Sequence, residues 1–365
     1  MKDFRLRNDT ELLFRENPVS DIAAFAAGKK VLFVYGGASI HKNGCFDDVK
    51  NAVTETGEML IELGSASREF ADVERGLALV KEHNIDVVIG VGGASIMDCA
   101  KLIAFGAFHE KDLWDYVKGR QNPYHQEKLP LLLIPTYPSS GSEYGLGAVT
   151  SDKRTDDFGT AFGIPANVAI LAPKYSLSLN AEMTRYTGLV TLVQLSAATI
   201  GDKNPVTYDA GISIIKNVLK AIKSLNENPN DLDARGIIMF GASISTSGRL
   251  GIGKEENYAY DIYEVEFIPE ALFGSTYRKS LTTLFPRFLK VISKYYYNDI
   301  QKYFCDVFGY DGDVAESADK MIKLFEKIGV NMTFDSEVTK ESVRSIEIES
   351  DLTTEELYEI IRECI

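Results

Sequence analysis

Residues 85–104 read Ile85-Asp-Val-Val-Ile-Gly-Val-Gly-Gly-Ala-Ser-Ile-Met-Asp-Cys-Ala-Lys-Leu-Ile-Ala104, and they carry the clearest signal of secondary structure in the chain. An apolar run ends in the paired glycines Gly92 and Gly93, and apolar residues then recur at the i, i+3, i+4 spacing of a helix. A short apolar strand followed directly by a helix is typical of a parallel sheet that is covered on both faces. The stretch therefore predicts a strand–turn–helix unit within an α/β domain.

The first half of the chain repeats this alternation, and the second half does not. Apolar runs that predict strands are followed by amphipathic stretches that predict helices; the strands are expected at 31–35, 85–90, 131–134 and 168–171, and the helices at 45–58, 69–83 and 95–107. From about residue 181 the patterns are helical, over 185–200, 209–225, 314–328 and 354–364. We expect two domains, an α/β domain of residues 1–180 and an all-helical domain of residues 181–365.

Composition excludes several classes of function. The 365 residues include 39 Lys and Arg against 53 Asp and Glu, a net charge of −14, which disfavours nucleic acid as a partner. No apolar run approaches the roughly 18 residues of a membrane span, and the first residues lack the apolar core of a signal peptide. The four cysteines form no C-x-x-C pair. We therefore expect a cytoplasmic protein with reduced thiols and no membrane attachment.

Three loops that follow expected strands carry the candidate chemistry. Gly-Gly-Ala-Ser-Ile occurs at 36–40 and again at 92–96, where backbone N–H groups can face a phosphate and the second copy opens a helix. The alternative is purely conformational, because Ser95 and Asp98 have the spacing of a capping box. Residues 135–143 form a third, hydroxyl-rich loop, which is either a polar surface turn or part of a dinucleotide site. None of the three loops contains the G-x-G-x-x-G fingerprint.

A fourth motif resembles a triphosphate-binding loop only in part. Residues 248–254 fit G-x-x-x-x-G-K, but Glu255 stands where the magnesium-binding Ser or Thr would be, and residues 243–247 do not predict a strand. We do not expect triphosphate binding there.

The three loops together resemble the iron-containing alcohol dehydrogenase family, particularly its NADP-using, butanol-dehydrogenase-like branch. The resemblance covers most of the chain and rests on residues 35–44, 92–101, 135–143, 173–179 and 281–286. It implies a Rossmann-like N-terminal domain and a helical C-terminal domain with a cleft between them, the dehydroquinate synthase-like fold. It also implies a small-molecule carbonyl or alcohol substrate, and a homodimer, since relatives are often dimers.

The resemblance further implies a nicotinamide cofactor. Gly36 stands where NAD-preferring relatives have an Asp that binds the ribose, and Ser39 and Lys42 could hold a 2′-phosphate. NADP is therefore the expected cofactor, and NAD is the alternative. The implied cofactor-binding residues are Gly36, Gly37, Ser39, Lys42, Gly92, Gly93, Ala94, Ser95, Asp98, Thr136, Ser140 and Leu179.

The chain departs from the family at the metal. Relatives hold their metal with one Asp and three His of the helical domain, whereas all four histidines of this chain lie in its first 125 residues. Thr191 stands at the Asp position and Leu195 at the first His position. Tyr277 aligns with the last His, and either Tyr263 or Asp261 with the one before it. Such a set does not supply the imidazoles or carboxylates that iron or zinc needs, so we expect neither metal.

Without a metal, another group must polarise the substrate oxygen. Tyr263, Tyr277 and Lys279 are the candidate catalytic residues, although packing is the more common role of a tyrosine in a chain that has 18 of them. The preferred hypothesis is an NADP(H)-dependent alcohol dehydrogenase-like oxidoreductase that works without a metal. The alternative is a catalytically silent, dinucleotide-binding homologue with a sensor or partner role. A repurposed dehydroquinate-synthase-like site ranks last, because that reaction also needs a metal.

Overall fold

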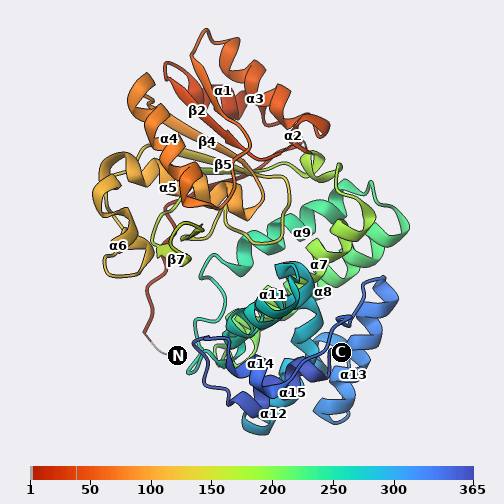
Figure 1. Ribbon diagram of the computed structural model, residues 1–365. Coiled ribbons are helices and arrows are strands. Elements are labelled where there is room, and N and C mark those ends of the chain that lie inside the picture. The colour runs from red at the N-terminus through yellow and green to blue at the C-terminus, as the bar shows by residue number, and fades with distance from the viewer. Residues whose placement is uncertain (1–2, 38) are drawn as a thin grey trace. The chain divides into compact units, whose positions relative to one another are not determined.

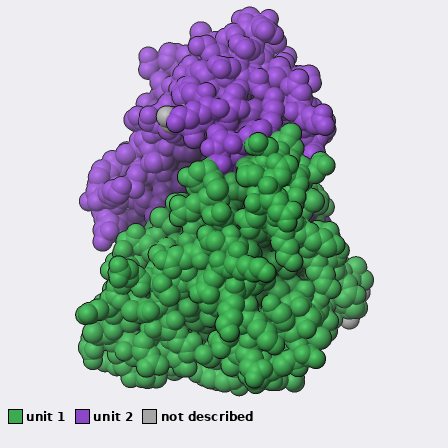
Figure 2. Space-filling view, turned by 90° about the vertical axis from the view of Figure 1, so that its right-hand side faces the viewer, with its two compact units in different colours: residues 1–5, 180–241, 248–365 green, residues 6–179, 242–247 purple. Residues whose placement is uncertain are grey.

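The computed structural model describes residues 3–37 and 39–365, and the chain forms two compact units (Figure 2). The sheet unit comprises residues 6–179 and 242–247, and the helical unit comprises residues 1–5, 180–241 and 248–365. The short segment 242–247 belongs to the sheet unit, although the residues on both sides of it in the sequence belong to the helical unit. The expected fold class, an α/β part followed by an all-helical part, is confirmed.

The sheet unit is built on six parallel strands in the order β1-β8-β5-β4-β2-β3. Their bounds are β1 (Glu11–Phe14), β2 (Val31–Tyr35), β3 (Leu60–Leu63), β4 (Val87–Gly92), β5 (Leu131–Pro135) and β8 (Val168–Leu171). The four expected strands are β2, β4, β5 and β8, which occupy the interior of the sheet. The two edge strands β1 and β3, with four residues each, were not predicted. The antiparallel hairpin of β6 (Gly147–Asp152) and β7 (Asp157–Phe162) was not predicted either.

Helices cover both faces of this sheet (Figure 1). One face packs against α1 (Val19–Ala26) and α3 (Cys45–Thr54), and the other against α4 (Phe70–His83), α5 (Ala94–His109) and α6 (Leu113–Val117). Along β2, alternate side chains enter the two cores, so every residue of the strand is buried. Burial on both sides is why the interior strands appear in the sequence as unbroken apolar runs.

The helical unit contains the longest helices of the chain. Its elements are α7 (Ala181–Thr199), α8 (Pro205–Glu227), most of α9 (Leu232–Ser245), α10 (Ile262–Val265), α11 (Phe267–Phe273), α12 (Tyr277–Phe308), α13 (Val314–Ile328), α14 (Lys340–Arg344) and α15 (Thr354–Arg362). Helix α7 is buried along nearly its whole length, between α8 and α12, and begins at Asn180, whose side chain accepts the Met183 N–H. None of the described helices combines the length and apolar character that a membrane span requires.

The strand order creates a switch point, and with it a crevice, at the carboxyl ends of the strands. The chain leaves β2 towards β3 on one side and then returns to β4 on the other side of β2. The connections that follow β2 and β4 thus run in opposite directions, with their helices α3 and α5 on opposite faces. In open parallel sheets, ligands bind at such a switch point, beyond the carboxyl ends of the strands.

Close packing of α5 on β4 holds one wall of this crevice. A Cβ atom on Gly90 would lie 2.6 Å from the Cβ of Ala100 and 2.8 Å from Cδ2 of Leu133. Only glycine at this position lets the helix approach the strand so closely.

We expect Gly90→Ala to lower the free energy of unfolding of the sheet unit by about 1–3 kcal/mol, because the added methyl overpacks the contact between strand and helix. Urea denaturation followed by fluorescence of Trp114, the single tryptophan, measures this unit. Gly37→Ala is the matched control, since no described atom lies within 4 Å of its added Cβ. Equal midpoints for the two variants would contradict the packing argument.

Candidate functional site

The three glycine- and hydroxyl-rich loops meet at the carboxyl ends of β2, β4 and β5. The backbone N–H of Thr136 donates to the carbonyl of Gly92 at 3.0 Å. Cβ atoms built on Gly36 and Gly92 would lie 3.2 Å and 2.8 Å from Ile96, the side chain that both loops share. The sheet therefore brings together loops that are about a hundred residues apart in the sequence. Ala38, in the first copy of the repeated motif, lies outside the described residues.

The first turn of α5 is open towards this crevice. The helix begins at Ala94 with Gly93 as its N-cap, and no side chain caps it. A Cβ on Gly93 would meet only Cβ of Tyr137, at 3.7 Å, and Ser95 is exposed. Uncapped N–H groups at the start of a 16-residue helix, beside glycines, form a site that suits a pyrophosphate.

The capping-box interpretation of Ser95 and Asp98 is wrong. Since the helix starts at Ala94, Ser95 already lies inside the first turn, and Asp98 faces another part of the unit. The buried carboxylate of Asp98 accepts the hydroxyl of Ser142 at 2.5 Å and the N–H of Val149 at 3.2 Å. Burial raises the pKa of Asp98, and the positive charge of Lys101 opposes that rise. Asp98 thus ties α5 to the third loop.

Lys101 completes this connection from one helical turn further on. It is fully buried, and its ammonium donates to the carbonyls of Gly145 and Gly147 and to the hydroxyl of Ser142. Burial lowers the pKa of Lys101, while the charge of Asp98 raises it. Ser142 is therefore shared, donating to the carboxylate and accepting from the ammonium. Sequence reasoning assigned Lys101 no role; the available signal was an ionisable residue within an otherwise apolar helix.

Glu143 is the second buried carboxyl group in this cluster. The hydroxyl of Ser243, at the C-terminal end of α9, donates to its Oε1 at 2.5 Å, while Oε2 has no hydrogen-bond partner among the described residues. Burial raises the pKa of Glu143, which favours the protonated form. This bond helps to explain why segment 242–247 groups with the sheet unit.

The remaining predicted cofactor residues lie around the crevice without forming one connected set. The short helix α2 (Ser39–Lys42) begins at Ser39 and ends at Lys42, and both of these residues are exposed. The Ser140 hydroxyl accepts the N–H of Ser142 at 3.2 Å. Leu179 follows the 3-10 turn η2 (Pro173–Ser176), to which its backbone N–H is bonded.

All three predicted catalytic residues lie in the helical unit, and two of them are tyrosines. Tyr277 is the first residue of α12, and the side chain of Gln194 donates to its hydroxyl at 3.4 Å. Tyr263 lies on α10. Burial raises the pKa of both tyrosines, so both hydroxyls keep their protons at neutral pH.

Lys279 is placed differently. Its ammonium lies over the ring of Phe334, 5.4 Å from the ring centre. Residues two apart on a helix point about 200° away from each other, which separates Lys279 from Tyr277. The structure thus does not bring this cation together with the Tyr277 hydroxyl.

The positions that would hold a family metal do not fit one. Thr191 and Leu195 are fully buried on α7, and both would contact a Cβ placed on Gly241 of α9, at 3.3 and 3.6 Å. The Thr191 hydroxyl already donates to the carbonyl of Thr187 at 2.9 Å, and leucine has no donor atom. Among residues 3–37 and 39–365, no three His, Cys, Asp or Glu side chains gather as metal ligands would. A threonine, a leucine and protonated tyrosines do not match the preferences of iron or zinc.

The G-x-x-x-x-G-K motif has a structural explanation. The segment before it is the end of helix α9 rather than a strand. The carboxylate of Asp202 accepts the N–H groups of Gly251 and Gly253, and Lys254 donates to the carbonyl of Ala197. The glycine N–H groups of this loop are therefore bonded to a carboxylate of the chain itself.

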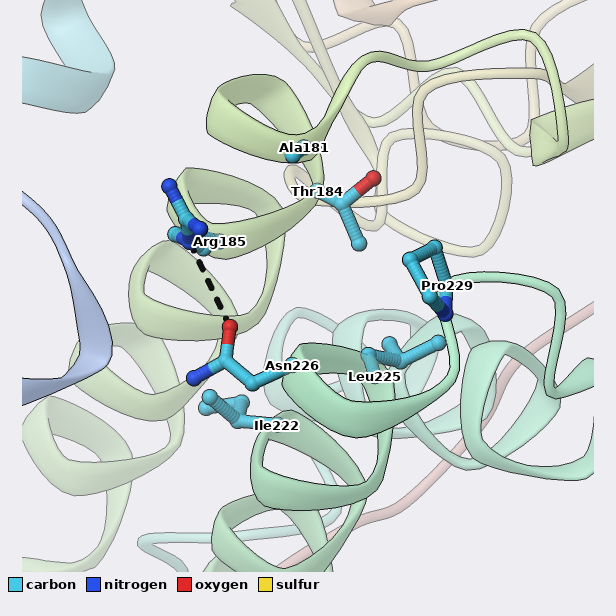
Figure 3. Close-up of a pocket in the computed structure, with 7 residues that line it drawn as sticks. All are labelled: Ala181, Thr184, Arg185, Ile222, Leu225, Asn226 and Pro229. Carbon is cyan, nitrogen blue, oxygen red and sulfur yellow. Dashed lines mark hydrogen bonds between the residues drawn. The ribbon is translucent and has the colours of Figure 1, made fainter.

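A small pocket lies within the helical unit, between the start of α7 and the end of α8 (Figure 3). Its volume is about 80 Å³, and Arg185 at its margin donates to the side chain of Asn226 at 3.3 Å. Ligand pockets usually measure roughly 300–1,000 Å³, so this one is too small for a dinucleotide.

Parts of the chain are similar to known dehydrogenases and reductases. Residues 9–173, which include all three loops, match the family model of iron-containing alcohol dehydrogenase. The chain is 27% identical over 299 residues to probable NADH-dependent butanol dehydrogenase 1 of Bacillus subtilis, covering 80% of this chain and 76% of that relative. It is 26% identical over 301 residues to the NADPH-dependent aldehyde reductase YqhD of Escherichia coli, covering 78% and 75%.

The fold also matches solved structures. NADH-dependent butanol dehydrogenase A of Thermotoga maritima superposes with a TM-score of 0.89 at 22% identity, over 100% of this chain and 99% of the other.

We expect Asp98→Asn to lower the free energy of unfolding of the sheet unit by about 3 kcal/mol, because it leaves the buried Lys101 ammonium without its nearest opposite charge. The double variant Asp98→Asn/Lys101→Met should recover a large part of the loss. Urea denaturation followed by Trp114 fluorescence checks both. Additive effects of the two substitutions would contradict the proposed coupling.

Proposed function

We propose that the chain is a member of the iron-containing alcohol dehydrogenase family and an NADP(H)-dependent oxidoreductase that interconverts small carbonyl compounds and alcohols without a catalytic metal. The observation that carries the proposal is the uncapped start of α5, with glycines around it, at the switch point of a parallel sheet. The names of the relatives, NADH-dependent butanol dehydrogenase and NADPH-dependent aldehyde reductase, support a nicotinamide coenzyme and this class of substrate.

The preference for NADP rests on the first loop. Gly36 offers no carboxylate at the end of β2, and the exposed Ser39 and Lys42 on α2 are available to a 2′-phosphate. A carboxylate at position 36 would repel that phosphate, whereas a lysine nearby attracts it. Since the relatives include both NADH- and NADPH-dependent enzymes, the choice is decided by these side chains and requires measurement.

The proposed chemistry places a tyrosine hydroxyl where relatives have a metal. When bound, the reduced nicotinamide supplies a hydride. The substrate oxygen then needs a hydrogen-bond donor for the negative charge that develops on it. Tyr277 is the preferred donor because its raised pKa keeps it protonated and Gln194 donates to its oxygen, which helps to orient the O–H group. Tyr263 is the second candidate, and Lys279 remains a prediction. A homodimer and a cytoplasmic location also remain predictions.

The first test is a titration of the purified protein with NADPH, followed by coenzyme fluorescence, with iron and zinc determined on the same sample. We expect saturable NADPH binding, weaker NADH binding, and less than about a tenth of an equivalent of either metal, because the donor set lacks imidazoles. A full equivalent of iron or zinc would overturn the metal-free proposal. Binding of NADPH without turnover on a panel of aldehydes would favour the catalytically silent alternative.

The second test is Tyr277→Phe, which removes the hydroxyl and keeps the ring. We expect kcat/KM for aldehyde reduction to fall by about 100- to 1,000-fold, with NADPH affinity unchanged, as for loss of one oxyanion donor. Tyr297→Phe is the control, since Tyr297 is an exposed tyrosine further along the same helix. Full activity in Tyr277→Phe would remove this residue from the mechanism and direct attention to Tyr263.

A further inference from the structure

A second cavity lies in the sheet unit, at the edge opposite to the coenzyme loops. It measures about 340 Å³ and is formed where β1, β5 and β8 begin, beside the C-terminal end of α5. Its apolar lining includes Phe105, Pro123 and Ile164, and its polar lining includes His125 and Lys128. A cavity of this size falls within the range of small-molecule sites. The coenzyme loops follow the other ends of the strands, so this cavity is not part of the site at the switch point.

Lys128 lies on the lining of this cavity and is half-buried. Its ammonium donates to Oδ1 of Asn167 at 2.5 Å, and it forms no ion pair with any carboxylate of the described residues. Burial lowers its pKa to about 8, and the charge of Asp9 opposes this only in part. A group with this pKa is half deprotonated at pH 8, whereas an ordinary lysine is almost entirely protonated. A lysine that is partly desolvated and lacks a carboxylate partner is the type that attacks carbonyl groups.

The other titratable groups of the cavity leave this amine available. Asp9 is bonded to Arg7 at 2.5 Å. The imidazole of His109, which is not part of the lining, contacts the backbone carbonyl of Glu127 at 3.0 Å. Glu127 itself is exposed. His125 lies on the cavity wall with a backbone φ of +68°, a left-handed conformation that costs free energy for a residue other than glycine. Such strain is often found where a side chain is held in place for function.

We propose that Lys128 is a carbonyl-capture site, at which small aliphatic aldehydes condense reversibly with the lysine amine inside the second cavity. The amine nitrogen attacks the carbonyl carbon, a C=N bond forms, and the carbonyl oxygen leaves as water with the two protons of the amine. No electron is transferred, so no oxidant or reductant is needed. The apolar part of the lining favours an aldehyde with a short alkyl chain. This site is independent of the proposed oxidoreductase function.

Reductive trapping tests the proposal directly. The full-length protein is incubated at pH 8 with butanal and sodium cyanoborohydride, without coenzyme, and alkylated lysines are mapped by peptide mass spectrometry. With a pKa of about 8, the fraction of free amine at pH 8 is roughly 100-fold larger than for an ordinary lysine. The free amine of lower pKa is also a weaker nucleophile, which lowers its rate of reaction by about tenfold. We therefore expect Lys128 to be labelled about tenfold faster than the exposed Lys111.

Lys254 is the matched internal control. Burial lowers its pKa to about 8 as well, but its ammonium donates to the Ala197 carbonyl and lies 4.2 Å from the ring centre of Tyr260. Faster labelling of Lys128 than of both Lys254 and Lys111 supports the proposal, because Lys128 lies on the lining of this cavity and the two other lysines do not. Labelling of Lys128 no faster than Lys111, or no faster than Lys254, overturns it.

Two variants separate capture from other effects. Lys128→Arg keeps a donor for Asn167 but removes the nucleophile, so the fast-labelled site should disappear. Since the other site is not involved, NADPH affinity should stay unchanged. Replacement of the cavity lining by Ile164→Phe should slow labelling of Lys128 at least threefold while leaving Lys254 unaffected. Unchanged labelling of Lys128 in this variant would overturn the role of the cavity.

Discussion

The buried ammonium of Lys101 constrains the whole candidate coenzyme site. A cation in the protein interior needs acceptors on every side, and here they come from the third loop and from Asp98 on the same helix. Because Ser142 bonds to both charged groups, the loop after β5 cannot move without exposing them to apolar surroundings. The hydroxyl-rich loop is thereby fixed against α5. The uncapped N-terminus of the same helix lies within two turns of these residues, so one element carries both the anchor and the candidate anion site.

The helical unit has the fold of the solved dehydrogenase structures, but it carries no histidine at the positions where the resemblance would place metal ligands. Thr191 and Leu195 are packed against α9 as ordinary core side chains, and the two tyrosines are kept protonated by burial. Their side chains do not match the ligands that iron or zinc prefers. If the protein reduces carbonyl compounds, the charge on the substrate oxygen must be met by a hydroxyl, which is a weaker electrophile than a metal ion.

The parallel sheet has a candidate site at the carboxyl ends of its strands and another at their amino ends. At the carboxyl ends of β2, β4 and β5, glycines and a helix start provide backbone N–H groups for an anion. At the amino ends of β1, β5 and β8, a lysine amine faces a cavity with a partly apolar lining. The first arrangement suits a phosphate and the second suits a carbonyl carbon, and neither shares a side chain with the other.

The sequence by itself determined the interior strands, the helical character of the second half and the absence of histidine after residue 125. Burial on both faces leaves continuous apolar runs, so β2, β4, β5 and β8 were predictable, whereas the short edge strands β1 and β3 lack that signal. Only the tertiary structure decided the role of Asp98. Its partner Ser142 is 44 residues away, and local spacing alone favoured a cap that does not form. Likewise, the cavity at Lys128 is assembled from segments that meet only because β1 pairs with β8 and β8 with β5, a pairing that no local pattern specifies.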